Sequence, residues 1–267
     1  MNALLSNSEL IFKSSKSVVY RGTWKNNLVA IKQIPRRFCV MDQISLEVSA
    51  MQKLQEYENV VRFIDTVEYE DDIYIIMEWI SGNNSKDYVK FREKPLTEQD
   101  VRNIIYQVAS VLKNCNRLNL IYGDVKPENV MIERSGRVKL IDFGCTRPIN
   151  SVRNCYMGTP IYFPPEMFDK IFVPQHDVWC LGLLAYYLAC GEHPFITKYP
   201  GDFDALKKTI MNAPFGFQNP VWKDWSVEGK EIITGMLYKD PLVRLSIGDV
   251  YKHRWFDKAS SSYDLLP

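Results

Sequence analysis

The chain has 267 residues with a formal net charge of +1, and it is 46% hydrophobic and 24% charged. This composition is typical of a soluble globular protein, and it excludes the bulk positive field that would favour nucleic acid or an anionic membrane. No apolar run approaches the roughly 18 residues of a membrane span, and the N-terminus lacks the layout of a signal peptide. We therefore expect an intracellular protein, cytoplasmic or nuclear, with no direct contact to nucleic acid or membrane.

The cysteines and histidines do not indicate a disulfide framework or a zinc site. The six cysteines form no Cys-x-x-Cys pair, so free thiols in a reducing compartment are the expectation. The three histidines (His176, His193 and His253) lie far apart in the sequence and not at metal-ligand spacing.

The first part of the chain alternates in the manner of β-strands between residues 10 and 34. Residues 18–20 and 28–31 are β-type runs, and residues 24–27 between them carry a turn signal. Lys32 ends the second run, at a position where a lysine is most often a solvated head group. The pattern predicts two antiparallel strands joined by a tight turn.

Residues 42–55 are predicted to form a helix, because their apolar residues recur at helical spacing and Asp42 can cap the N-terminus. Glu47 lies beside this apolar stripe. Two further strands are expected at residues 60–63 and 73–77, with an acidic turn between them. The predicted result is a small antiparallel sheet with one main helix.

The second part of the chain is predicted to be mostly helical. Thr97 and Asp100 imitate a capping box, and the apolar residues after them keep to one face of a helix that runs to Cys115. Residues 178–190 are almost entirely apolar, and a helix that is apolar on all sides must be buried. Residues 81–85, which read SGNNS, mark the change of composition between the two parts.

Between these helices lies the stretch 121–144, which reads IYGDVKPENVMIERSGRVKLIDFG. Its apolar runs predict a hairpin of two short strands, residues 129–132 and 137–141, with Gly136 at the turn. Polar loops are expected at the open end of this hairpin.

Four polar side chains are expected to meet at that open end, namely Asp124, Lys126, Asn129 and Asp142. Phosphoryl transfer needs a carboxylate to orient and deprotonate a hydroxyl, oxygen ligands for Mg²⁺, and a cation near the moving phosphate. Any one of these residues alone is more often a solvated turn residue. The presence of all four in this order favours a site for phosphoryl transfer over a set of solvated turn residues.

The string Asp-x-Lys-x-x-Asn followed by Asp-Phe-Gly resembles the catalytic loop and the metal-binding triplet of eukaryotic-type Ser/Thr protein kinases. The resemblance implies that Asp124 is the catalytic base and that Lys126 steadies the γ-phosphate of ATP. It also implies that Asn129 and Asp142 hold Mg²⁺, with Mn²⁺ as an alternative. Where the family usually reads His-Arg-Asp, residues 122–124 read Tyr-Gly-Asp.

The resemblance extends to the nucleotide-binding residues of the first part. Residues 29–32 (Val-Ala-Ile-Lys) resemble the kinase strand whose lysine contacts the α- and β-phosphates, and Glu47 would form an ion pair with Lys32. Met77 would gate the back pocket, and the hinge after it would bind adenine through backbone groups. The nucleotide-binding positions implied are Lys32, Glu47, Ala30, Val19, Met77, Glu78, Ile80 and Met131.

Residues 158–166 resemble the end of a kinase activation segment, with Pro-Pro-Glu in place of the family's Ala-Pro-Glu. The resemblance implies a buried ion pair between Glu166 and Arg244, and it makes Asp177 the support of the catalytic loop. Thr159 would contact the catalytic aspartate and lysine. The Gly-Thr-Pro-x-Tyr run is of the Ser/Thr type, so the expected partner is a protein substrate bearing Ser or Thr.

The resemblance thus implies an α+β chain with the two-lobed protein kinase fold, in which a small antiparallel-sheet N-lobe with one main helix precedes a larger, mostly helical C-lobe. We expect a single catalytic domain over residues 1–267, with the N-lobe at about 1–80, the hinge at about 78–85 and the C-lobe at about 86–267. Residues 257–267 are read as a polar tail.

The loop before the first strand pair departs from the family pattern. Kinases usually place glycines there, but residues 12–19 contain none, and Phe12, Ser14 and Ser17 occupy the three glycine positions. An ATP-dependent Ser/Thr protein kinase is the leading hypothesis, and a pseudokinase that acts as a binding or scaffold module is the alternative because of this loop. A small-molecule kinase is a weaker reading, because the Gly-Thr-Pro-x-Tyr run is a protein-substrate feature.

Four positions of the resemblance bear on substrate preference and regulation. Glu128 would favour a basic residue near the acceptor, but the two other acidic positions of arginine-directed kinases are Asn84 and Tyr187 here, so no strong arginine preference is expected. Gly123 replaces the arginine that binds a phosphorylated activation segment, so activity without that phosphorylation is expected. The short chain and the glycine-free loop also resemble kinases of large DNA viruses.

Overall fold

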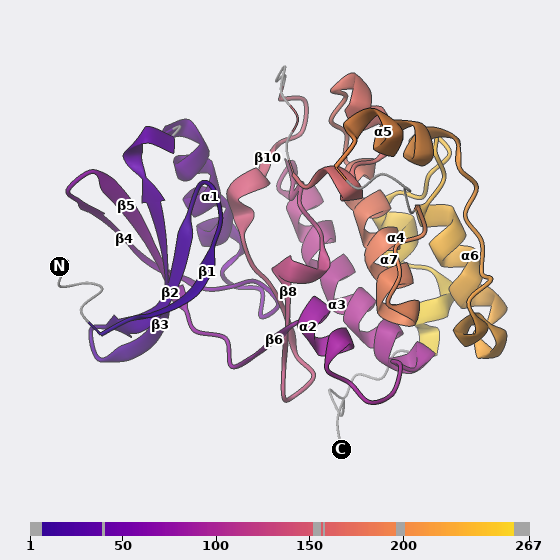
Figure 1. Ribbon diagram of the computed structural model, residues 1–267, viewed down its shortest axis with the longest axis horizontal. Coiled ribbons are helices and arrows are strands. Elements are labelled where there is room, and N and C mark those ends of the chain that lie inside the picture. Colours follow the sequence, from indigo (N-terminus) through magenta and orange to yellow (C-terminus); the bar gives the residue numbers. More distant parts are fainter. Residues whose placement is uncertain (1–6, 39–40, 152–155, 157, 196–200, 259–267) are drawn as a thin grey trace.

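The computed structural model describes residues 7–38, 41–151, 156, 158–195 and 201–258. A smaller part built on a β-sheet and a larger part made mostly of helices lie side by side, and the chain crosses between them near strand β6 (Figure 1). The predicted α+β, two-lobed kinase fold is confirmed by this arrangement. Most of the predicted polar tail, from residue 259 on, lies outside the described residues.

The smaller part is a five-stranded antiparallel sheet in the order β1-β2-β3-β5-β4. Its strands are β1 (Glu9–Lys13), β2 (Val18–Trp24), β3 (Asn27–Pro35), β4 (Phe63–Tyr69) and β5 (Asp72–Glu78). Lys25 and Asn26 join β2 to β3 with φ angles of 49° and 67°, the positive values that a two-residue hairpin turn needs. The predicted strand pair and its tight turn are therefore confirmed.

Helix α1 (Met41–Leu54) shares a hydrophobic core with this sheet. Its residues Ile44, Met51 and Leu54 are buried, as expected for side chains that recur at helical spacing on one face. The predicted cap is wrong, because Asp42 lies inside the first turn rather than before it. There its carboxylate still meets the positive end of the helix dipole.

The strand predicted at residues 60–63 is wrong, and β4 begins at Phe63. Among the described residues, Val60 pairs only through an isolated bridge to Leu140, and the Val61 N–H donates to the Leu140 carbonyl at 3.0 Å. Both valines are 2% exposed. Their apolar character therefore reflects burial at the junction of the two parts and not a place in the sheet.

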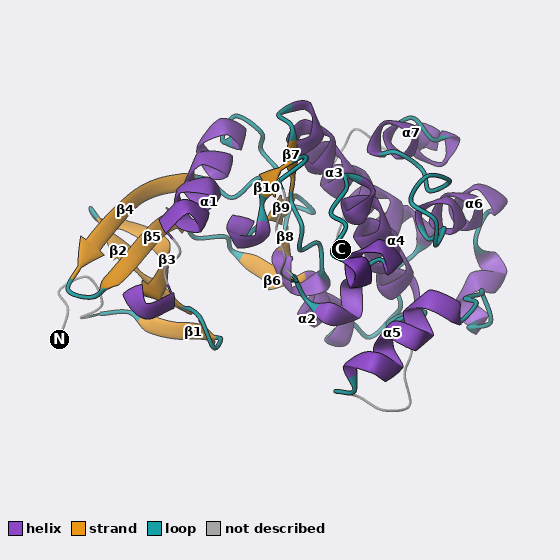
Figure 2. Cartoon of the chain, turned by 90° about the horizontal axis from the view of Figure 1, so that it is seen from above, coloured by secondary structure: helices purple, strands orange, loops and turns teal. Residues whose placement is uncertain are grey.

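The larger part is built from α2 (Ser85–Lys90), α3 (Glu98–Arg117), α4 (Gln175–Cys190), α5 (Phe203–Asn212), α6 (Val227–Met236) and α7 (Ile247–Tyr251). Helix α4 contacts α3, α6 and α7 (Figure 2). The predicted capping box of Thr97 and Asp100 is present, and the predicted buried helix is confirmed by α4, whose side chains are buried on all sides. Within the described ranges, none of the helices combines the length and apolar content needed to cross a bilayer.

Two small sheets lie between the β-sheet and the helices. Strands β6 (Gly82–Asn84), β8 (Val130–Glu133) and β9 (Val138–Leu140) form one, and β7 (Leu120–Ile121) pairs with β10 (Arg147–Pro148) in the other. The predicted hairpin is confirmed as β8 and β9, with strand ends that differ by one residue. Gly136 takes a φ of 79° in its turn, a left-handed value that glycine adopts without strain. Strand β6 occupies part of the expected hinge at residues 78–85.

A buried ion pair fixes the end of the segment before α4. Both terminal nitrogens of Arg244 donate to Glu166, at 2.7 and 2.8 Å, and the two side chains are 0% and 4% exposed. Arg244 also donates to the carbonyl of Gln175, the first residue of α4, at 2.9 Å. A pair of this kind fixes geometry more than it adds stability, and here it holds the segment around Glu166 against the central helix.

Candidate active site

A buried carboxylate holds the backbone that leads into the catalytic loop. Asp177, in the first turn of α4, accepts the N–H groups of Tyr122 and Gly123, both at 2.8 Å. Burial raises the pKa of Asp177 to about 7, while the two N–H donors act to lower it. The loop is thus fixed from the middle of the helical part immediately before Asp124.

Asp124, Lys126 and Thr159 form a triangle of hydrogen bonds. Lys126 Nζ lies 2.6 Å from Asp124 Oδ2 and 2.8 Å from Thr159 Oγ1, and the Thr159 hydroxyl donates to Asp124 Oδ1 at 3.1 Å. Asn129 Nδ2 donates to the Asp124 carbonyl and to its Oδ2, at 2.9 and 3.0 Å. The structure therefore brings together all three residues that the resemblance assigns to catalysis.

The surroundings of Asp124 keep its carboxylate basic. Burial raises the pKa of Asp124 above its ordinary value, and the charge and hydrogen bond of Lys126 lower it in part. A raised pKa means that the carboxylate takes up a proton more readily than an exposed aspartate, which suits a general base. A general base acts in its ionised form, so activity carried by Asp124 would be lost as the pH falls through this raised pKa.

The ammonium of Lys32 connects the two parts of the molecule. Its Nζ lies 2.6 Å from Glu47 Oε1 on α1 and 2.7 Å from Asp142 Oδ1 after β9. Burial acts to lower the pKa of Lys32, but the two carboxylates outweigh burial and raise it above the ordinary value. Burial likewise acts to raise the pKa of Asp142, and Lys32 keeps that pKa below its ordinary value. The Lys32–Asp142 pair is therefore ionised.

Asp142 and Asn129 offer oxygen ligands suited to a hard cation. Asp142 has a left-handed backbone with φ 60°, and its side chain is 42% exposed. Asn129 donates to Asp124 through its amide nitrogen, which leaves its Oδ1 as a ligand oxygen. Mg²⁺ is usually held by one or two protein oxygens together with phosphates and water, so this donor set fits Mg²⁺ or Mn²⁺. The described part of the chain contains no group of three or more His, Cys, Asp or Glu that would form a rival site.

Four of the eight expected nucleotide-binding residues share one face of the β-sheet. Val19 on β2 is directly opposite Lys32 on β3, and Ala30 on β3 is directly opposite Met77 on β5. Opposite residues on antiparallel strands point to the same face, and so do residues two apart on one strand. Val19, Ala30 and Met77 therefore lie on the same face as Lys32, whereas Met131 comes from β8 in the other part.

The Glu78 side chain forms an ion pair that was not predicted. Its Oε1 accepts from Lys139 Nζ at 2.6 Å and from the Arg62 N–H at 2.8 Å, which connects the end of β5 to β9. The Glu78 N–H also donates to the Arg62 carbonyl at 3.0 Å, so both the side chain and the N–H of Glu78 are engaged within the protein. A lysine in the middle of an apolar strand is rarely buried unless paired, so Lys139 itself was the signal that could have revealed the pair.

The glycine-free loop between β1 and β2 closes on itself. The Ser14 hydroxyl accepts the N–H groups of Lys16 and Ser17 at 3.2 and 3.0 Å, and the Ser14 N–H donates to the Ser17 carbonyl at 2.9 Å. Phe12 is 56% exposed on β1. Two backbone donors of the kind that bind phosphates in a glycine-rich loop are thus already engaged by a side chain.

Tyr122 stands where the family usually has histidine, and it connects the catalytic loop to the segment of Asp142. Its hydroxyl donates to the carbonyl of Ile141, and its ring meets the ring of Phe143 edge-on with centroids 5.1 Å apart. In the sequence this tyrosine is visible only as a departure from His-Arg-Asp, but a buried tyrosine normally needs a hydrogen-bond partner, and here that partner is Ile141.

An aromatic stack fills the space beside Gly123, which has a φ of 85°. A Cβ at this position would lie 2.9 Å from the Cys145 carbonyl oxygen and 3.1 Å from Phe172 Cζ. The Phe172 ring lies 4.7 Å from the Arg147 guanidinium and 4.8 Å from the His176 ring. The stack joins β10, the segment before α4 and the first turn of α4, and no local sequence pattern pointed to it.

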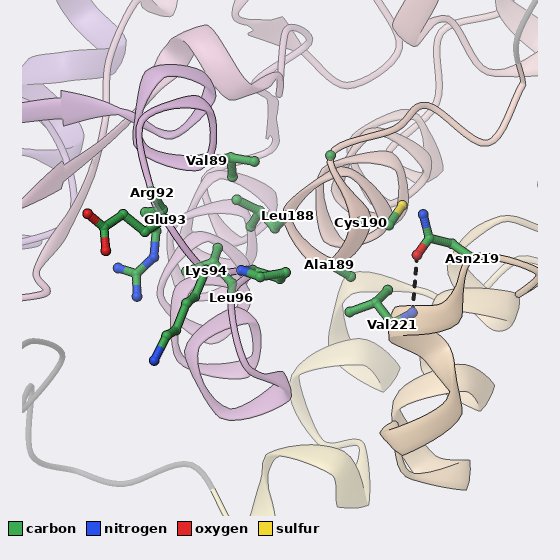
Figure 3. Close-up of a pocket in the computed structure, with 12 residues that line it drawn as sticks. Val89, Arg92, Glu93, Lys94, Leu96, Leu188, Ala189, Cys190, Asn219 and Val221 are labelled. Carbon is green, nitrogen blue, oxygen red and sulfur yellow. Dashed lines mark hydrogen bonds between the residues drawn. The ribbon is translucent and has the colours of Figure 1, made fainter.

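A cavity of about 230 Å³ lies elsewhere, between the end of α2, the start of α3 and the end of α4 (Figure 3). Its wall is largely apolar and includes Val89, Leu96, Leu188, Ala189 and Val221. None of the residues expected to bind nucleotide or metal lines this cavity, so it is not the site described above.

Comparison with known proteins shows that the chain is similar in sequence to protein kinases. The family model described as "Protein kinase domain" matches residues 7–256. The chain is 29% identical over 245 residues to CDPK-related kinase 8 of Arabidopsis thaliana, and 27% identical over 245 residues to calcium/calmodulin-dependent serine/threonine-protein kinase 1 of Oryza sativa subsp. japonica. Each alignment covers 88% of this chain and 40% of the relative, so the chain spans well under half the length of these two proteins.

We expect Asp142→Asn to abolish phosphoryl transfer while the protein stays folded. The substitution removes the charge that a divalent cation needs and one of the two carboxylates around Lys32. Transfer from γ-labelled ATP and Mg²⁺-dependent nucleotide binding would be measured, with circular dichroism as the folding check. Asp169→Asn, which changes an exposed carboxylate, is the matched control. Wild-type activity in Asp142→Asn would contradict the metal assignment.

Activity is expected not to require phosphorylation of the activation segment. Gly123 has no side chain to bind a phosphate, and the Phe172 stack already holds β10. Rates on a generic substrate would be compared before and after phosphatase treatment, with intact mass to verify removal of phosphate. Most of the rate should remain. A fall of about a hundredfold, the size expected for loss of a charge-assisted anchor, would refute this expectation.

Proposed function

The chain belongs to the protein kinase domain family, and from this premise we propose that it is an ATP-dependent serine/threonine protein kinase. It transfers the γ-phosphoryl group of Mg-ATP to Ser or Thr hydroxyls of protein substrates. The observation that carries the proposal is the hydrogen-bonded triangle of Asp124, Lys126 and Thr159. It presents a base, a cation and a positioning hydroxyl together, as phosphoryl transfer requires.

In this mechanism Asp124 orients the acceptor hydroxyl and takes its proton, a task for which its raised pKa is suited. Thr159 fixes one carboxylate oxygen by donating to it. Lys126 contacts both Asp124 and Thr159. Its positive charge stabilises the negative charge that develops on the phosphoryl group during transfer. Side chains already held in place need no reorganisation during the reaction.

On the nucleotide side, Lys32 binds the α- and β-phosphates and Glu47 orients its ammonium. Asn129 and Asp142 are the residues that would hold Mg²⁺ or Mn²⁺, which neutralises phosphate charge when bound. Val19, Ala30, Met77 and Met131 would surround the base and sugar, with backbone groups of Glu78 and Ile80 as its hydrogen-bond partners.

The proposal includes a single catalytic domain over residues 1–267, with the hinge near residues 78–85. The family match over residues 7–256 supports that extent. The location in cytoplasm or nucleus stays a prediction from composition. The alternative function is a pseudokinase that binds partners without catalysis, and the observation in its favour is the self-closed loop at Ser14.

The test of function is transfer of labelled γ-phosphate from ATP to a generic protein substrate by wild type and by Asp124→Asn. Asparagine keeps the shape of aspartate but cannot accept the proton, so the rate should fall by about a hundredfold or more. Equal melting temperatures would show that both proteins are folded. Equal rates would remove Asp124 from catalysis, and a wild type without transfer would favour the pseudokinase.

We expect detectable but weak Mg-ATP binding, with a larger share carried by Lys32 than is usual. The N–H groups of Lys16 and Ser17 already have an acceptor in Ser14. Loss of one or two charge-assisted hydrogen bonds to phosphate weakens binding by about tenfold or more.

Calorimetric titration of Mg-ATP would compare wild type, Lys32→Met and the double variant Ser14→Gly/Ser17→Gly. The double variant should bind more tightly and Lys32→Met should bind far more weakly. Ser15→Gly, in the same turn but outside these hydrogen bonds, is the matched control for added flexibility. Equal affinity of the double variant and wild type would show that the loop is not impaired. No binding by wild type at millimolar ATP would refute the kinase proposal.

A further inference from the structure

Glu128 places a carboxylate at the edge of the proposed acceptor site. It lies in the short turn Pro127–Asn129, directly before Asn129, whose amide donates to Asp124. Its Oε1 accepts from Lys86 Nζ at 2.8 Å. Its Oε2 is buried and has no hydrogen-bond partner within the described part of the chain, so Lys86 is the cation that compensates this carboxylate.

The elements that carry Lys86 and Glu128 hold the two residues opposite each other. Lys86 lies in the first turn of α2, and the neighbouring Ser85 hydroxyl donates to the Pro127 carbonyl at 3.0 Å. Ser85 is fully buried, so the start of α2 is anchored to the turn that carries Glu128. Lys86 is therefore fixed opposite Glu128 by the backbone, although its own side chain is 54% exposed.

Besides Glu128, the groups whose charges act on Lys86 are Tyr187 and Asp87. The hydrogen bond and charge of Glu128 raise the pKa of Lys86, so Lys86 is a cation at neutral pH. Asp87, the next acidic group on α2, accepts from the Asn84 side-chain amide at 2.7 Å, and its own N–H donates to Asn84 Oδ1 at 2.9 Å. Tyr187 of α4 faces the same region and is uncharged at neutral pH. Without Lys86 the local surface would carry the uncompensated charge of Glu128.

We propose that Lys86 sets the substrate preference of this kinase by occupying Glu128, so that the acceptor segment it phosphorylates carries neutral or acidic residues rather than arginine beside the Ser or Thr. The inference rests on the proposed kinase function. A substrate arginine that approaches Glu128 must displace Lys86 and meets its positive charge. Repulsion between Lys86 and a substrate arginine disfavours binding of that substrate. A substrate carboxylate would instead be attracted to Lys86.

The test uses peptides that differ in one residue. Each peptide contains one serine and one arginine, and the arginine is placed in turn at each position before and after the serine. For each position, matched peptides carry alanine or glutamate in place of the arginine. The kcat/KM ratio of each arginine peptide to its alanine partner is measured for wild type, Lys86→Ala and Lys90→Ala. Lys90 is an exposed lysine at the other end of α2, so Lys90→Ala controls for loss of a charge on this helix.

Wild type should show an arginine-to-alanine ratio near or below one at every position. Lys86→Ala should raise that ratio about fivefold at one or two positions through a lower KM, the size expected for one exposed charge pair, and high salt should reduce the gain. Adding Glu128→Gln should remove it.

An unchanged ratio in Lys86→Ala, or an equal rise in Lys90→Ala, would overturn the inference while the kinase function stands. A wild type that prefers arginine would overturn it as well. A wild type that phosphorylates none of the peptides or a generic protein substrate would refute the proposed function itself, and the inference with it.

Discussion

The ammonium of Lys32 is the contact on which the arrangement of the two parts depends, because β3, α1 and the segment of Asp142 meet at it. A buried cation between two carboxylates is stable only while its partners remain, since removal of one partner leaves an uncompensated buried charge. Gln43 adds a second connection from α1, donating to the Gly144 carbonyl at 2.6 Å. A shift of α1 would therefore disturb Lys32 and Asp142 together.

The second half of the site is supported from α4. Asp177 accepts the N–H groups of Tyr122 and Gly123, the two residues before Asp124. The Tyr122 hydroxyl also donates to the carbonyl of Ile141. The proposed base and the proposed metal ligand Asp142 are thus connected through a single buried side chain. Because each support is a hydrogen bond to buried backbone, its loss would leave an unpaired polar group in the core, which is costly.

The parts of the fold that could be predicted from the sequence are those set by local pattern. The β8–β9 hairpin follows from short apolar runs around Gly136, and α4 follows from a long apolar run. Val60 shows the limit, because two valines that are buried at a junction look the same in sequence as two valines in a strand. The Glu78–Lys139 pair and the Phe172 stack were missed because they join distant segments, and periodicity carries no information about such contacts. The hairpin pattern alone was enough to expect the polar side chains from Asp124 to Asp142 at its open end, whereas Lys32, Glu47 and Thr159 were connected to them only by the resemblance.

The charges of the site explain why a divalent cation belongs to the proposed function. Lys32 contacts the carboxylates of Glu47 and Asp142, and Lys126 contacts the carboxylate of Asp124, so the site holds three carboxylates for two ammonium groups. The two ammonium groups are thus matched by carboxylates and leave no excess of positive charge for a nucleotide, and the loop at Ser14 has its N–H groups engaged. The phosphates of ATP carry several negative charges and would find no net attraction at such a site alone. A divalent cation held by the proposed oxygen ligands at Asn129 and Asp142 would change this balance, since a doubly charged ion makes the site positive toward the phosphates.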